Sequence, residues 1–161
     1  MTIEIKYCPI GIIKSPFKEI DGMPIQPLGA GGIRGEAEIF PEYEKGLQDI
    51  DGYSHLILIY HLHLCKGMEL LIKPFLEDKL HGVFSTRAPN RPNPIGISVV
   101  KLVSVQANRL IIEDVDILDQ TPLLDIKPFV SSFDNRYETK DGWLTARQLE
   151  ARTKRSDTRF R

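Results

Sequence analysis

Short stretches of alternating apolar and polar residues recur along the chain. Residues 3–7 and 35–40 each alternate with a period of two, which is typical of a strand with one buried face. More continuous apolar runs indicate further strands. These lie at residues 10–13, 53–65, 83–86, 97–105, 109–113, 115–118 and 123–129. The pattern predicts a chain built mainly from short strands.

Almost no helical period separates these strands. Pro41 can open a short helix, and residues 144–161 are the one convincing helical stretch, with a basic end formed by Arg152, Lys154, Arg155, Arg159 and Arg161. Short strands at close spacing favour an antiparallel barrel or sandwich. The first strand is not followed by the glycine pattern of a dinucleotide-binding fold. We therefore expect a mainly β fold at residues 1–144, followed by a basic helix or tail at 145–161.

The most distinctive stretch is the loop between two of these strands, residues 82–100. It carries Pro89, Pro92 and Pro94 together with Arg87 and Arg91. Proline fixes φ and drives the preceding residue toward extended geometry, so the loop is stiff without a ladder of hydrogen bonds. A stiff loop loses little entropy when its polar groups bind a ligand. The alternative is a rigid surface crossover whose arginines are only solvated.

Composition and charge narrow the function classes. The chain has 161 residues, 42% of them hydrophobic and 27% charged, and a net charge of −1. Whole-molecule charge therefore gives no case for nucleic-acid binding, and an RNA contact would need a local patch. Two cysteines, Cys8 and Cys65, form neither a disulfide framework nor a zinc motif and suit a reducing cytoplasm. No apolar run is long enough for a membrane span.

Two groups of side chains could support chemistry directly. His61 and His63 are two residues apart on a predicted strand, so both would project from one face. A metal would need a third ligand, and a histidine that lines a pocket is the simpler interpretation. Asp116, Asp119 and Asp125 lie close together in the sequence and could do acid–base work, or cap the local backbone.

Four motifs stand in order along the chain. Ser85-Thr86-Arg87 precedes residues 91–98, RPNPIGIS. The others are residues 12–17 (IIKSPF), 53–56 (YSHL) and 121–129 (TPLLDIKPF). Together they resemble the TsaA-like family of S-adenosylmethionine-dependent tRNA methyltransferases, over about residues 10–144. The resemblance implies a β-barrel homodimer that binds S-adenosylmethionine near the subunit interface.

The resemblance also implies the site residues. The cofactor-binding positions are Pro24, Ile25, Gln26, His63, Leu64, Arg87, Ile97, Asp119, Gln120, Thr121 and Pro122. Arg91 and Asn93 are expected to hold phosphate or base edges of the RNA. The implied acceptor is the exocyclic nitrogen of threonylcarbamoyladenosine, next to the anticodon of tRNA. No metal is implied. His63 and Asp125 are hypotheses for the proton acceptor.

This sequence departs from the family pattern at two of these positions. Ile25 stands where bacterial enzymes usually have arginine, and Gln120 replaces a glycine. These changes leave a second hypothesis, a non-catalytic nucleotide- or RNA-binding barrel. A third and weaker hypothesis is a metal-dependent barrel enzyme that uses His61 and His63.

Overall fold

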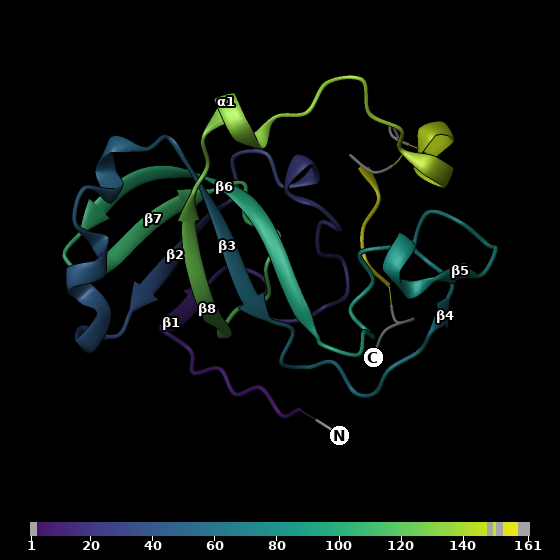
Figure 1. The fold of residues 1–161 in the computed structure, drawn as a ribbon, viewed down its shortest axis with the longest axis horizontal. Coiled ribbons are helices and arrows are strands. Elements are labelled where there is room, and N and C mark those ends of the chain that lie inside the picture. Colours follow the sequence, from purple (N-terminus) through teal and green to yellow (C-terminus); the bar gives the residue numbers. More distant parts are fainter. Residues whose placement is uncertain (1–2, 148–149, 151–152, 158–161) are drawn as a thin grey trace.

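A closed, antiparallel, six-stranded barrel forms most of the protein (Figure 1). The computed structural model describes residues 3–147, 150 and 153–157. Around the barrel the strands follow the order β1, β2, β7, β6, β3 and β8, and β8 pairs with β1 to close it. The barrel strands are β1 (Gly11–Lys14), β2 (Arg34–Ile39), β3 (His55–His61), β6 (Ile95–Gln106), β7 (Arg109–Glu113) and β8 (Thr121–Pro128). The predicted mainly β fold with a small antiparallel barrel is confirmed.

Short elements complete the fold. β4 and β5 form a separate two-stranded sheet beside the barrel (Figure 1). Their bounds are Leu71–Ile72 and His81–Gly82, and the short α-helix α1 is Ser131–Asp134. Short 3-10 helices lie at Pro27–Gly29, Pro41–Leu47, Ile50–Gly52, Val83–Ser85 and Gly142–Arg147. None of the helices within the described residues has the length and apolar character needed to span a lipid bilayer.

The alternating side chains of the strands fill the barrel. Along β3, Leu56, Leu58 and Tyr60 point inward and are almost fully buried. Val100 of β6 and Leu110 of β7 meet them in the same core cluster. Full burial of each such aliphatic side chain contributes about 1.5–3 kcal/mol before entropy is counted. Tyr60 is the last inward residue of β3, so it lies toward one end of the barrel.

The predicted strand at residues 3–7 is wrong. Ile3, Ile5 and Tyr7 are 80%, 67% and 68% exposed, and the segment is irregular. Its sequence alternates correctly, but it has no edge to join, because β1 already pairs with both β2 and β8. A closed barrel leaves no free strand edge.

Three other predicted strands are shorter than expected or are absent. Residues 83–85 form a 3-10 turn, and β3 ends at His61, where the chain enters a turn closed by Cys65 N donating to Leu62 O. Residues 115–118 are irregular, although Val115 and Ile117 are buried. Their apolar side chains close the end of the barrel instead of extending a strand.

The C-terminal segment is not the continuous helix expected over residues 144–161. Gly142–Arg147 is a 3-10 turn, and Lys154 N donates to Glu150 O in a further helical turn. Arg155 then pairs with Pro24 in an isolated antiparallel bridge. The bridge stops the helix, because Ser156 exchanges backbone hydrogen bonds with residues 22–23. The predicted basic residues Arg152, Arg159 and Arg161 lie outside the described residues.

Candidate functional site

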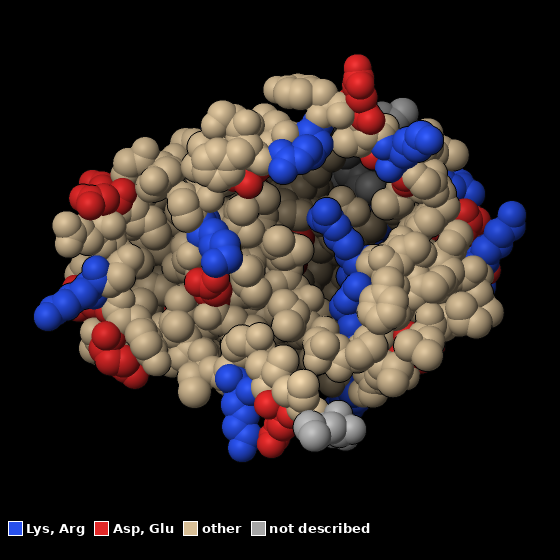
Figure 2. Space-filling view, in the orientation of Figure 1, with Lys and Arg blue, Asp and Glu red and all other residues tan. Residues whose placement is uncertain are grey.

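Three adjoining cavities lie against the proline-rich loop and the adjacent end of the barrel. Their volumes are about 300, 180 and 200 Å³, and Ile25 and Arg87 line all three. We call the continuous hollow that they form the Arg87 cleft. In Figure 2, basic side chains gather around a hollow in this face of the molecule. The cleft brings together segments that are distant in the sequence.

The loop that carries Arg87 is held by its own hydrogen bonds. Thr86 Oγ1 donates to Val83 O and accepts from Ala88 N, which fixes the turn before the prolines. Arg91 Nη1 donates to Thr86 O at 2.8 Å and to Val83 O at 3.2 Å. Arg91 therefore braces the loop while it also lines one cavity. Asn93, the other predicted RNA contact, is exposed and outside the three cavities.

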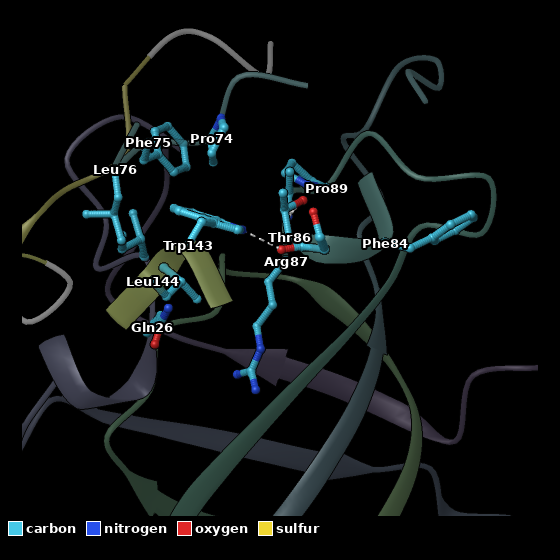
Figure 3. A pocket seen from close by; sticks show the side chains of 13 residues that line it. Gln26, Pro74, Phe75, Leu76, Phe84, Thr86, Arg87, Pro89, Trp143 and Leu144 are labelled. Carbon is cyan, nitrogen blue, oxygen red and sulfur yellow. Dashed lines mark hydrogen bonds between the residues drawn. The ribbon is translucent and has the colours of Figure 1, made fainter. Parts of the chain in front are cut away.

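Arg87 is the free cation of the cleft. Its side chain extends away from Trp143 and toward the barrel strands (Figure 3). Among the described residues, none forms a hydrogen bond or ion pair with its guanidinium group. An arginine in this state can bind a carboxylate or phosphate through two parallel hydrogen bonds.

The predicted cofactor segment at residues 24–26 forms one wall. Pro24 is buried, and Ile25 and Gln26 face the cleft. The C-terminal segment holds this wall in place: Met23 N donates to Ser156 Oγ at 3.0 Å, and Ser156 N donates to Met23 O at 2.9 Å. Ser156 itself lines the cleft beside Pro24. No motif in the sequence predicted this contact.

The predicted turn at residues 119–122 contributes only one residue to the cavity walls. Thr121 is buried and lines the cleft, and its Oγ1 donates to Leu118 O at 2.7 Å. The other three, Asp119, Gln120 and Pro122, line none of the three cavities.

Asp119 instead ties the turn to the loop after β1. Its carboxylate accepts hydrogen bonds from Ser15 N and Lys18 Nζ. Burial alone would raise the pKa of Asp119, but the hydrogen bonds from Lys18, Ser15 and Gln120 outweigh it, so the pKa is lowered. The negative charge of Asp119 is therefore balanced within the protein.

The histidine region lies at the end of β3. His63 and Leu64 line the cleft, but His63 follows the strand and does not share a strand face with His61 as predicted. Burial and the neighbouring His61 lower the pKa of His63, so its imidazole is neutral at pH 7. In the described part of the chain, no group of three or more His, Cys, Asp or Glu side chains could hold a metal ion. Ile97 of β6, 52% exposed, lines the cleft from the other side.

One part of the cleft is an aromatic pocket that sequence reasoning missed. Trp143 Nε1 donates to Ser85 O at 2.8 Å, and its ring stacks on His81 with centroids 4.6 Å apart. Phe75 and Leu144 lie beside Trp143 in Figure 3. The only tryptophan in the sequence was a signal that could have indicated this pocket. Its flat apolar walls suit an aromatic ring.

A buried polar chain at the barrel end also faces the cleft. Tyr60 and Asp116 line two of the cavities, and Ser98 joins them by hydrogen bonds. The sequence indicated Asp116 only as one of three acidic residues near a turn. Ser98 belongs to the loop motif, but its partners depend on strand register and could not be predicted.

A family model described as the tRNA-methyltransferase O N-terminal domain matches residues 12–135. The chain belongs to this family. A solved member, TrmO from Pseudomonas aeruginosa, superposes with a TM-score of 0.74 at 36% identity, covering 88% of this chain and 63% of that one.

Sequence relatives of this TrmO-family chain carry related names. A probable S-adenosyl-L-methionine-binding protein of Pyrococcus abyssi is 54% identical, covering 99% of this chain and 87% of that protein. A mouse tRNA (adenine(37)-N6)-methyltransferase is 34% identical over 79% of this chain. The chain spans 31% of the mouse protein and less than two thirds of the solved TrmO chain.

Proposed function

We propose that this protein is an S-adenosylmethionine-dependent methyltransferase that acts on the base next to the anticodon of tRNA. The observation that carries the proposal is the Arg87 cleft. Its walls include implied cofactor-binding residues from five separate segments. These residues are Pro24, Ile25, Gln26, His63, Leu64, Arg87, Ile97 and Thr121. The family and the names of its members support the same function.

The shape and charge of the cleft suit this chemistry. Methyl transfer from a sulfonium is a displacement in which the protein mainly has to hold donor and acceptor in line. Arg87 is available for the carboxylate of the methionine moiety. The wall at residues 24–26 is fixed by Ser156 and Arg155, so it can present backbone groups to the adenine with little loss of entropy. Asp119, Gln120 and Pro122 act by shaping the Thr121 turn.

The acceptor fits the remainder of the cleft. Threonylcarbamoyladenosine lies in an unpaired loop, where a base can be splayed out and stacked on aromatic side chains. The pocket around Trp143 and Phe75 offers such a surface. Arg91 and Asn93 lie on the loop that borders the cleft and contact the RNA backbone. We propose that residues 145–161 form a basic tail to the barrel domain and that the protein acts in the cytoplasm.

We further propose that the protein functions as a homodimer. The outward face of β6 exposes Ile95, Ile97, Val99 and Val103, each between 38% and 52%. The register places Ile59 and Ile57 of β3 beside Ile97 and Val99 on the same face. Ile95 and Ile97 also line the Arg87 cleft. A second copy packed on this apolar stripe would cover the open side of the cleft.

The proposal is tested by calorimetry and methyl transfer on the same protein. We expect S-adenosylmethionine to bind, and an Arg87→Gln variant to bind at least ~10-fold more weakly, about 1.4 kcal/mol. Arg136→Gln is a matched control. Arg136 is exposed and lines none of the three cavities, and its hydrogen bonds within the described residues go only to the backbone carbonyls of Phe133 and Asn135.

Methyl transfer is measured on tRNA with and without the threonylcarbamoyl group, followed by nucleoside mass spectrometry. Methylation of the modified tRNA alone supports the proposed acceptor. Cofactor binding without transfer to any tRNA would favour the non-catalytic barrel instead.

A further inference from the structure

Three polar side chains form a buried chain at the barrel end that faces the Arg87 cleft. Tyr60 is 7% exposed and Ser98 is 2% exposed. Tyr60 Oη lies 3.0 Å from Ser98 Oγ, and Ser98 Oγ donates to Asp116 Oδ1 at 2.6 Å. A serine hydroxyl has one proton to donate. While Asp116 is ionised, Tyr60 must therefore donate to Ser98, and Asp116 is the acceptor end of the chain.

The backbone is shaped to hold this chain. A Cβ atom at Gly96 would lie 2.2 Å from Tyr60 Cε2, so only glycine leaves room for the tyrosine ring. The pairing of β3 with β8 shifts its register between Ile59 and Tyr60. Register shifts of this kind re-aim side chains next to functional sites. Gly96 and Ser98 of the loop motif therefore both serve Tyr60.

Asp116 is partly buried without a full counter-charge. Within the described residues, no lysine or arginine lies at ion-pair distance from its carboxylate. Burial raises the pKa of Asp116 to about 6, while the Ser98 hydrogen bond and the charge of Arg87 pull it down. Burial and the Asp116 charge raise the pKa of Tyr60, so the phenol stays neutral and remains a donor. The other charged or titratable side chains on the cleft walls are Arg91, His63 and Cys65, and burial raises the pKa of the Cys65 thiol.

A carboxylate in this setting makes the core less stable than apolar residues would. A buried polar chain whose charge is only partly neutralised lowers stability. Such chains are retained at functional sites when the chemistry needs them. A general base works best when its pKa lies near the pH at which it operates. Asp116 meets this condition and lines two cavities of the Arg87 cleft, in which the methyl donor and acceptor would meet.

We propose that Asp116 is the proton acceptor of methyl transfer and that Ser98 and Tyr60 position its carboxylate. The inference rests on the proposed function. The acceptor nitrogen attacks the methyl carbon, the methyl–sulfur bond breaks, and its electron pair stays on sulfur. The nitrogen loses its proton to Asp116. A sulfonium and a carboxylate thus become a neutral thioether and a neutral carboxylic acid, which then returns its proton to solvent.

The two acceptors considered from the sequence are placed differently. Asp125 lines a separate hollow, with Tyr53 and Ile10, and forms an ion pair with Lys127 at 2.7 Å. It shares no cavity with Arg87. His63 does line the cleft, in one of the two cavities that Asp116 lines, so it is the competing assignment that an experiment must separate.

The test compares Asp116→Asn, His63→Gln and the matched control Asp125→Asn with the wild type. Single-turnover methyl transfer is measured from pH 5 to pH 9 with saturating S-adenosylmethionine. The wild-type rate should rise with pH through an apparent pKa near 6 and then level off. Asp116→Asn should be slower by ~10²–10⁴-fold and lose this rise. Asp125→Asn should remain within about threefold of the wild type. His63→Gln should keep the rise with pH, whatever its effect on the rate through cofactor binding.

Further measurements separate structural damage from lost chemistry. S-adenosylhomocysteine is a neutral thioether, so Asp116→Asn should bind it within about threefold of the wild-type affinity. Ser98→Ala removes the hydrogen bond that lowers the pKa of Asp116, so it should move the apparent pKa of the rate upward without abolishing transfer. Tyr60→Phe should also raise the apparent pKa of the rate, but by a smaller amount.

Each remaining outcome has a definite meaning. A normal Asp116→Asn rate, or a loss confined to His63→Gln, overturns the assignment while the proposed function stands. A wild-type protein that transfers no methyl group to tRNA overturns the proposed function, and the assignment fails with it.

Discussion

Replacing Asp116 with asparagine should stabilise the protein at neutral pH. The change keeps the size of the side chain and leaves an oxygen for the Ser98 hydroxyl, but it removes the buried negative charge. The pKa of Asp116 rises on folding from its ordinary 3.8 to about 6. Each pKa unit corresponds to ~1.4 kcal/mol of differential stability, so the ionised carboxylate costs the native state about 3 kcal/mol.

The sign of this effect fixes its pH dependence. The native protein holds the Asp116 proton more tightly than the unfolded chain does, so this residue stabilises the fold below pH 4. That stability is lost as the pH rises through about 6. The free energy of unfolding of Asp116→Asn minus that of the wild type should therefore be about 2 kcal/mol larger at pH 8 than at pH 4. All other titrating groups cancel in this difference.

Urea denaturation of both proteins at several pH values measures this difference directly. Asp119→Asn serves as a control of opposite sign, because the pKa of Asp119 is lowered on folding. It should destabilise the protein at neutral pH, and the difference should shrink as the pH falls through the native pKa. An Asp116→Asn difference that does not change between pH 4 and pH 8 would refute the reasoning.

Three further substitutions test other parts of the structure. Gly96→Ala should destabilise by about 1–3 kcal/mol in urea denaturation, because its Cβ would meet the Tyr60 ring; an unchanged midpoint would mean that the ring moves freely. Gln120→Gly should raise stability by up to ~1 kcal/mol, because residue 120 has φ 62°, a left-handed conformation that favours glycine. A lower thermal midpoint would contradict this. Ser156→Ala removes the hydroxyl that accepts from Met23 N, so we expect a loss of about 1–3 kcal/mol and weaker S-adenosylmethionine binding by calorimetry. Unchanged affinity would show that the C-terminal segment does not hold the cofactor wall.

Much of the barrel could be predicted because its strands carry local patterns. The apolar runs within residues 109–113 and ending at Tyr60 match β7 and β3 closely. The segment at residues 3–7 alternates regularly and yet forms no strand. A local pattern shows that a segment could form a strand. Whether a free strand edge exists for it to pair with depends on closure of the whole barrel.

The candidate site also contains some residues that could be predicted from the sequence and others that could not. Arg87 and residues 24–26 could be placed from motifs, because a motif identifies residues whatever their distance in space. The contacts Tyr60–Ser98 and Ser98–Asp116 could not be predicted, because they depend on the register of β3 against β6 and on how the chain after β7 crosses the barrel end. Ser156 reaches the cleft from a segment whose own sequence indicated only helix, and Trp143 lies just before that segment.

The most direct test of the central claim is transfer of a labelled methyl group from S-adenosylmethionine to threonylcarbamoylated tRNA by the purified protein. Nucleoside mass spectrometry then locates the label. We predict that the label appears on the modified adenosine next to the anticodon with the wild type and that Arg87→Gln reduces it strongly. A tRNA pool that stays unlabelled, or a label at another nucleoside that is unaffected by Arg87→Gln, would contradict the account.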